Sequence, residues 1–282
     1  MRAMRLCVLA LSTIGAMASA QEIPGPPPVL VVNREEIKPG KMPAHTKAAA
    51  GFVAVAEKAK ATNYRLALTP VSGDDNSVVY LEGYPSFAAF ETARNAFDSA
   101  LANNAALRAE LEALDREGDQ HSSQRTAIYR YRGDLSYRPM RMDGVARSRY
   151  MTISTTRVKP GRGVDYTDWL KGLNAAREKT GSDAHTAVYQ VVSGAPNNTF
   201  ISFGTARSLT EWDDFTAKME EANKALDAAV GGPDAVKQRR MVLFDVVADA
   251  TTALYAMTPE LSRPAPEFIA HDPAFWGARP KK

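Results

Sequence analysis

The sequence predicts an α+β protein built from two tandem copies of one βαββαβ unit, packed sheet against sheet. The tripeptide KPG occurs at 38–40 and again at 159–161, each time after an apolar run and before a helical pattern. When these tripeptides are aligned, an offset of 121 holds from Val29 to Pro85 and gives 13 identical residues in 57 positions. A unit of about 120 residues has the size of a small domain, so the repeat indicates a duplicated domain.

Each unit shows the same order of expected elements. A first strand rich in β-branched residues ends at KPG, and about twenty residues with apolar side chains at helical spacing follow it. Two strands joined by a short Gly/Asn turn then predict a hairpin. A long second helix, starting near Ser86 in the first unit and near Ser208 in the second, comes next. The expected strands are 29–37, 64–71, 77–84 and 125–131 in the first unit, and 150–158, 185–192, 199–205 and 240–248 in the second.

This order is that of a ferredoxin-like split βαβ unit, whose sheet carries helices on one face only. The segments KPG and EGYPSFAAF in this setting resemble the dimeric α/β-barrel superfamily, which includes antibiotic-biosynthesis-type monooxygenases, NIPSNAP-like proteins and chlorite-dismutase-like haem proteins. The resemblance covers nearly all of 29–139 and 150–258. It implies that the two units close into one intramolecular dimeric α/β barrel. The chain also resembles uncharacterised exported bacterial proteins with KPGK and EGYxSFAA segments.

The N-terminal residues predict that the protein is exported. Residues 1–20 carry two arginines, a short apolar run and a small-x-small end at Ala18–Ala20, which is typical of a signal peptide. Its apolar run is too short to span a bilayer. We therefore expect a periplasmic or secreted protein without stable membrane insertion after cleavage.

The rest of the chain is expected to have five parts. These are a Pro-rich leader (21–28), a first unit (29–139), a linker (140–149), a second unit (150–257) and a Pro-rich C-terminal arm (258–282).

Composition narrows the function classes. Cleavage removes the only cysteine, Cys7, so the mature chain has neither a disulfide nor a thiol nucleophile. It also leaves 33 Lys and Arg against 32 Asp and Glu, a net charge of +1. That balance argues against a nucleic-acid partner, which needs a concentrated basic face.

Strand alternation predicts which side chains line the barrel. We expect the more polar set of the first strand, Asn33 and Glu35 with Val31, to face the interior, and Leu30 and Val32 to face the helices. In the third strands the inward set is expected to be Tyr80, Glu82 and Tyr84, opposite Ile201, Phe203 and Thr205. The resulting candidate ligand-binding residues are Asn33, Glu35, Arg65, Glu82 and Tyr84. The alternative is that these polar groups only satisfy one another.

Cofactors and metals are not predicted. Haem-degrading members of the superfamily have an Asn, an Arg and a Gly at the spacing of Asn33, Arg34 and Gly40, but they carry a haem-ligating His on the second helix. The second helix here has none before His121, near its end. The other histidines are His45, expected on an exposed helical turn, His185 and His271. No two are three or four residues apart, so spacing predicts no metal site.

Three functions remain, and the catalytic residues of any enzyme stay unknown. The main expectation is a protein that binds a small organic molecule in the barrel or between the units. The first alternative is a monooxygenase-like enzyme of the superfamily. The second is a non-catalytic structural or assembly protein. A tandem barrel is complete in one chain, so a homo-oligomer is not required, although exposed helices can still pair two copies.

Overall fold

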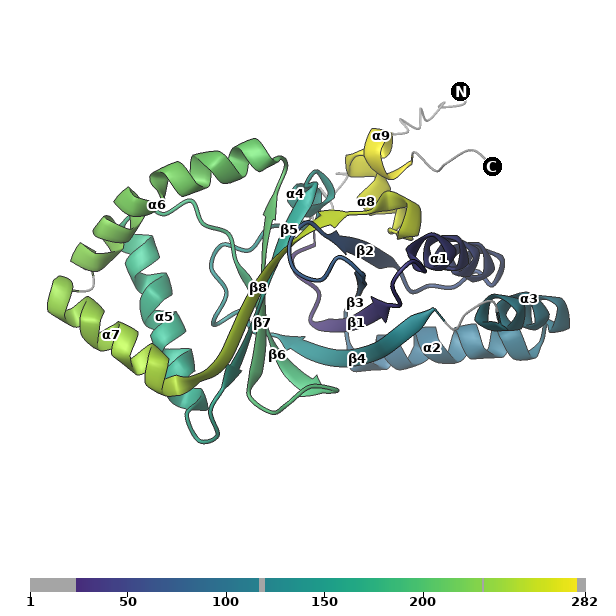
Figure 1. The fold of residues 1–282 in the computed structure, drawn as a ribbon, viewed down its shortest axis with the longest axis horizontal. Helices are drawn as coiled ribbons and strands as arrows, with labels where there is room; N and C mark the ends of the chain where they lie inside the picture. The colour runs from purple at the N-terminus through teal and green to yellow at the C-terminus, as the bar shows by residue number, and fades with distance from the viewer. Residues whose placement is uncertain (1–23, 117–119, 230, 278–282) are drawn as a thin grey trace, which may run out of the picture.

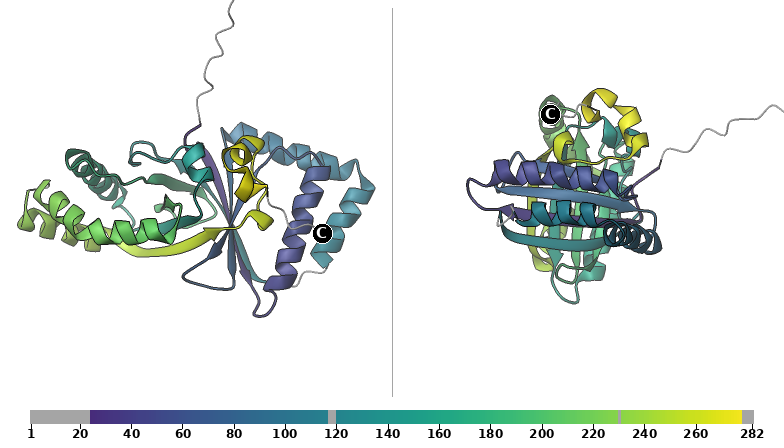
Figure 2. Two further views of the ribbon diagram at one scale, coloured as in Figure 1. Left: turned by 90° about the horizontal axis from the view of Figure 1, so that it is seen from above. Right: turned by 90° about the vertical axis from the view of Figure 1, so that its right-hand side faces the viewer.

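The computed structural model describes residues 24–116, 120–229 and 231–277. A closed barrel of eight strands stands at the centre, with helices outside it on two opposite sides (Figure 1). The view from above shows the same layers, with helices of the first unit on one flank and helices of the second unit on the other (Figure 2). The predicted fold class is confirmed.

Both units show the order βαββαβ, with the second helix of each divided in two. The first unit comprises β1 (Val29–Ile37), α1 (Met42–Lys58), β2 (Arg65–Pro70), β3 (Ser77–Tyr84), α2 (Phe87–Ala102), α3 (Ala105–Arg116) and β4 (His121–Tyr131). The second comprises β5 (Tyr150–Val158), α5 (Gly163–Lys179), β6 (Ala187–Ser193), β7 (Thr199–Ala206), α6 (Leu209–Ala229), α7 (Pro233–Val246) and β8 (Val247–Met257). Between the units lies the short helix α4 (Met142–Ala146).

The strand order shows how the two units close the barrel. It runs β1-β3-β2-β8-β5-β7-β6-β4, and all neighbours are antiparallel. In the first unit, β4 pairs with β1 of the same unit and with β6 of the second unit. In the second unit, β8 pairs with β5 of the same unit and with β2 of the first unit. Two seams, β2–β8 and β4–β6, leave no open sheet edge.

The repeated KPG is a turn that only glycine makes without strain. Gly40 has φ of 75° and Gly161 has φ of 78°, a left-handed conformation that disfavours residues with a Cβ. Each turn ends the first strand and leads directly into the first helix. The tripeptide thus recurs because each unit needs the same exit from its first strand.

The predicted last strand of the second unit was wrong. Residues 240–248 were expected to form it, but α7 continues to Val246 and β8 begins at Val247. The apolar run belongs to a helix that buries Val246 while Phe244 is 83% exposed. β8 instead pairs along the whole of β5, and this pairing determines where the strand starts.

The predicted orientation of the first strands was also wrong. Leu30 and Val32 lie in the barrel core with Met151 and Ile153, whereas Val31 packs on the helix side with Ala93 of α2. A small eight-stranded barrel is filled by its own side chains, so the strand face that carries the apolar side chains turns inward. Asn33 and Glu35 consequently lie outside the lumen, between sheet and helices.

The correspondence between β3 and β7 in the structure is shifted by one residue from the sequence alignment. Val79 and Leu81 point into the core and correspond to Ile201 and Phe203, an offset of 122. The second hairpin turn holds one residue more than the first. Tyr80 and Tyr84 therefore face the helices, contrary to prediction, while Ile201 and Phe203 face inward as predicted.

The C-terminal arm covers one mouth of the barrel. It folds into the 3-10 turn η1 (Pro259–Leu261) and the short helices α8 (Pro266–His271) and α9 (Pro273–Trp276). Phe268 and Trp276 join the barrel core, and the Trp276 indole donates a hydrogen bond of 2.7 Å to the Ala146 carbonyl. The predicted signal peptide lies outside the described residues. None of the helices described is both long and apolar enough to cross a membrane.

Candidate functional site

A cavity of about 510 Å³ opens at the mouth that the arm covers. Its inner wall consists of apolar side chains of the lumen, among them Leu30, Leu81, Met151 and Phe203. The Pro-rich leader, α4 and the start of α8 form its outer wall, at 24–28, 140–145 and 264–268. A chamber of this size and lining fits a small apolar molecule.

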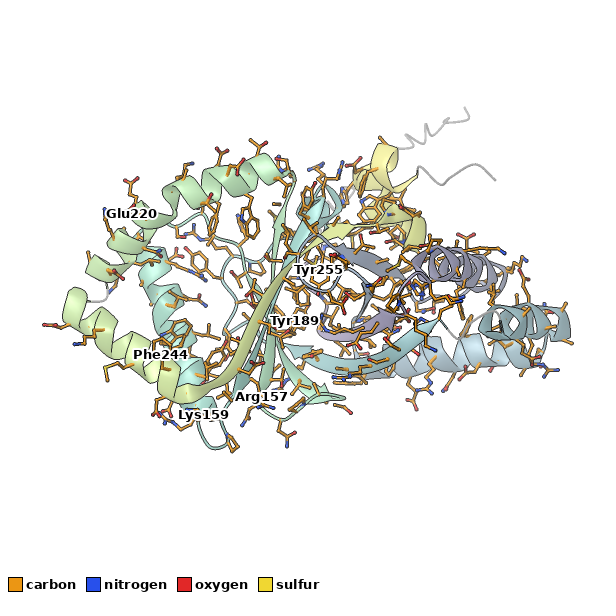
Figure 3. All side chains as sticks on the ribbon, in the orientation of Figure 1. Arg157, Lys159, Tyr189, Glu220, Phe244 and Tyr255 are labelled. Atoms are coloured by element: carbon orange, nitrogen blue, oxygen red, sulfur yellow. The ribbon has the colours of Figure 1, made fainter. Side chains whose placement is uncertain are left out.

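Few of the residues that line this cavity are polar, and they include Arg65, His185 and Thr205. The Thr205 hydroxyl is buried and has no hydrogen-bond partner among the residues described. Tyr189 lies deep in the barrel, as Figure 3 shows, and its burial raises the pKa of the phenol, which therefore stays protonated. A buried hydroxyl without a partner costs free energy, so Thr205 contributes an unfavourable term to the stability of the barrel.

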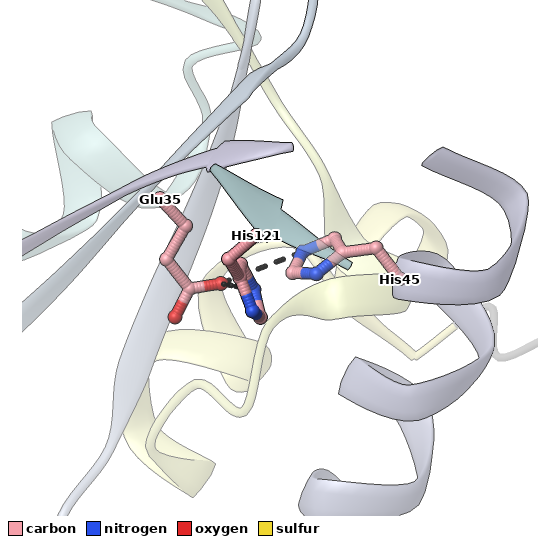
Figure 4. A group of neighbouring side chains, drawn as sticks. All are labelled: Glu35, His45 and His121. Atoms are coloured by element: carbon pink, nitrogen blue, oxygen red, sulfur yellow. Dashed lines mark hydrogen bonds and ion pairs between the residues drawn. The ribbon is translucent and has the colours of Figure 1, made fainter. Parts of the chain in front are cut away.

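A second cluster lies on the opposite face of β1, between the sheet and α1. Glu35 of β1, His45 of α1 and His121 of β4 point toward one another (Figure 4). The Glu35 Oε2 atom lies 3.2 Å from His121 Nε2 and 3.6 Å from His45 Nε2. Glu35 and His45 are buried, and His121 is half-buried.

Neighbouring side chains hold the other oxygen of the Glu35 carboxylate. Glu35 Oε1 accepts hydrogen bonds from Asn33 Nδ2 at 2.8 Å and from Gln124 Nε2 at 2.9 Å. Thr126 donates to the Asn33 amide oxygen at 3.2 Å. These contacts leave Oε2 directed at the two imidazoles.

Burial favours the neutral forms of His45 and Tyr80. Burial lowers the pKa of His45, although the Glu35 charge opposes this shift. The Tyr80 hydroxyl lies 3.2 Å from His45 Nε2, and burial raises the pKa of Tyr80 far above its usual range. A neutral imidazole beside a carboxylate is a metal-ligating combination.

The structure separates the predicted ligand-binding residues. Asn33 and Glu35 belong to the cluster just described. Arg65 stacks over the Tyr80 ring at 4.4 Å, and the Tyr84 hydroxyl donates to Glu82 at 2.6 Å. Arg65 and Tyr84 also reach the rim of the cavity. The five residues do not form one lumenal site.

Sequence reasoning missed His45 and His121, and it placed Thr205 inside the barrel without naming it as a candidate binding residue. His45 was expected to be exposed, but it is 3% exposed because the first turn of α1 packs against β1 and β3. His121 pairs with Ile37 after a β-bulge, which brings it beside Glu35. The signal that was available is a glutamate near the end of a strand and a histidine one turn into the following helix.

Comparisons with known proteins agree with the architecture. No family model and no curated protein matches the chain. A solved anthrone oxidase-like protein aligns with a TM-score of 0.50 and 14% identity, over 82% of this chain and 91% of that one. The chain has the dimeric α/β-barrel fold. Identity this low shows the fold alone.

Other solved structures align less well. A proposed monooxygenase from Fusobacterium nucleatum gives a TM-score of 0.49 at 15% identity, over 82% of this chain and 93% of that chain. A chlorite dismutase variant from Candidatus Nitrospira defluvii, in complex with cyanide, gives 0.46 at 10% identity, over 83% and 92%.

Proposed function

We propose that this dimeric α/β-barrel protein binds a small, largely apolar organic molecule in the cavity beneath its C-terminal arm. The observation that carries this proposal is an apolar cavity of about 510 Å³ whose outer wall is formed by the leader, α4 and the start of α8. Leu30, Met151 and Phe203 would contact the ligand.

A neutral fluorescent probe tests this proposal. N-phenyl-1-naphthylamine brightens when it leaves water, so titration into the mature chain measures occupancy of the cavity. Met151→Trp places a larger side chain in the cavity and should weaken binding at least about tenfold, a loss of about 1.4 kcal/mol. Met241→Trp makes the same change on a side chain that is 61% exposed on α7, and should bind as the parent does.

Two results would count against a cavity ligand. Equal binding by the parent and by Met151→Trp, with both folded by thermal melting, would place the probe elsewhere. A parent that does not bind the probe at all would also contradict an apolar chamber. Native mass spectrometry of the protein as purified then identifies any retained molecule, and the same spectrum counts the subunits.

Oxidation of the bound molecule is the second candidate, because the cavity is apolar and an anthrone oxidase-like protein shares the fold. Such a reaction converts a ring CH₂ to C=O, and O₂ supplies one oxygen atom and leaves the other as water. Anthrone under air should then give anthraquinone with one O₂ consumed per molecule. Conversion by Met151→Trp at the parent's rate would contradict a reaction in this cavity.

We also propose that the protein acts outside the cytoplasm, on the strength of residues 1–20. The expected mature N-terminus is Gln21. N-terminal sequencing of the protein from a periplasmic or culture fraction checks this, and an intact Met1 in the cytosolic fraction would contradict it.

A further inference from the structure

We propose that Glu35, His45 and His121 form a binding site for a divalent transition-metal ion of the zinc type. The site lies between β1, α1 and the start of β4, outside the barrel lumen. It is separate from the ligand cavity: Leu30, at the cavity, and Glu35 lie five positions apart on β1, about 16 Å at strand spacing, and face opposite sides of the strand.

The first argument is the donor set and its spacing. Two imidazoles and one carboxylate are a common protein ligand set for Zn²⁺, with a fourth position left for water. Two donors at about 2.1 Å from a tetrahedral metal lie about 3.4 Å from each other. The distances from Glu35 Oε2 to the two Nε2 atoms are 3.2 and 3.6 Å, and all donor atoms lie within 4.8 Å of one another.

The second argument is the support around the carboxylate. Hydrogen bonds from Asn33 and Gln124 occupy Oε1 and orient Oε2 toward the imidazoles. Outer partners of this kind fix a ligand's orientation and usually affect metal affinity. The Tyr80 hydroxyl, 3.2 Å from His45 Nε2, stands where it can hydrogen-bond a metal-bound water.

The third argument is the internal control that the duplicated unit provides. The positions of Glu35 and His45 are taken by Thr156 and Tyr166 in the second unit, at the offset of 121. His121 pairs with Ile37 after a bulge, and Val247 pairs with Val158 after the corresponding bulge. The fold therefore does not require ligating side chains at these positions.

A bound ion would tie together a strand, a helix and a second strand that are distant in sequence. Because the ion binds the folded chain, it should raise the melting temperature as its concentration increases. At one hundred times the dissociation constant, the expected rise is about 5–10 °C for a chain of this size. Occupancy of the cavity by N-phenyl-1-naphthylamine should not change, so this proposal and the binding function fail separately.

The test is a titration of the untagged, chelator-treated mature chain with Zn²⁺, followed by melting and by elemental analysis after gel filtration. One Zn²⁺ per chain is expected. Glu35→Gln and His121→Ala should each weaken binding more than about 100-fold, and Gln124→Ala by about 10–100-fold. His271→Ala is the matched control, since His271 lies on α8, away from the cluster, and it should bind as the parent does.

Binding of Co²⁺ gives an absorption spectrum that a change in protein stability alone would not alter. Co²⁺ in the parent should show the visible bands of a low-coordinate site, and Glu35→Gln should lose them while keeping the parent's circular dichroism. Absence of stoichiometric Zn²⁺ binding, or binding equally strong in folded Glu35→Gln and His121→Ala, would overturn the proposal and leave an ordinary hydrogen-bonded cluster.

Discussion

The two halves of the barrel place different chemistry at the same position between sheet and helices. In the first unit, Glu35, His45 and His121 meet with polar neighbours around them. In the second, Tyr166 packs against Phe200 with ring centroids 4.9 Å apart and stacks with Trp169 at 6.3 Å. One backbone thus supports either a polar cluster or an aromatic core. The duplication leaves one half to supply packing while the other holds ionisable groups.

The largest expected effect comes from breaking the aromatic half. Phe200 is 2% exposed, and Phe200→Ala should lower the free energy of unfolding by about 3–5 kcal/mol, since it removes a large side chain and leaves a cavity. Urea denaturation measures this change. A loss below about 1 kcal/mol would mean that the aromatic cluster contributes little to stability.

A smaller effect is expected in the polar half. When a chelator keeps metal away, Glu35→Gln should lower the free energy of unfolding by about 1–3 kcal/mol. The reason is that His121 and Gln124 lose a charged acceptor that is mostly buried. Thr156→Val, at the corresponding position, should change stability by less than about 1 kcal/mol. Equal losses from the two substitutions, in the same urea titration, would contradict a special role for the polar cluster.

The barrel mouth offers a third comparison. Gly83 and Thr205 occupy matching places, opposite Leu30 and Met151. A Cβ on Gly83 would lie 2.6 Å from Pro27 Cγ, so the leader packs closely against β3 at that point. Both Gly83 and Thr205 line the cavity, and only Thr205 brings a hydroxyl to this position.

Thr205→Val should therefore raise the free energy of unfolding by about 1 kcal/mol, because the buried hydroxyl has no partner. Thermal melting without ligand checks this effect. A destabilised Thr205→Val would show that the hydroxyl is already satisfied in the free protein.

The smallest effect is expected on the outer surface of α7. Phe244 is 83% exposed near the end of α7 (Figure 3), so Phe244→Ser should change stability by less than about 0.5 kcal/mol. Val246→Ala, two residues on and 1% exposed, is the buried comparison and should cost more. Similar losses in both would place the Phe244 side of α7 in an interface between copies.

The candidate site was only partly predictable. Asn33 and Glu35 were recognised as a polar pair on one face of a strand, but that face was assigned to the lumen. Alternation divides a strand into two faces, and closure of the barrel decides which face is inside. The partner histidines could not be found by spacing, because Glu35 and His121 are 86 positions apart and meet only through the pairing of β1 with β4.

By itself, the sequence determined the duplication, the βαββαβ order and the two KPG turns. Those features rest on local preferences: β-branched runs, helical spacing and a glycine that takes a positive φ. Only the tertiary structure decided the inward parity, the start of β8 and the meeting of Glu35, His45 and His121. These depend on contacts between distant segments, since a side chain's neighbours across a closed sheet are set by strand register and not by its position in the chain.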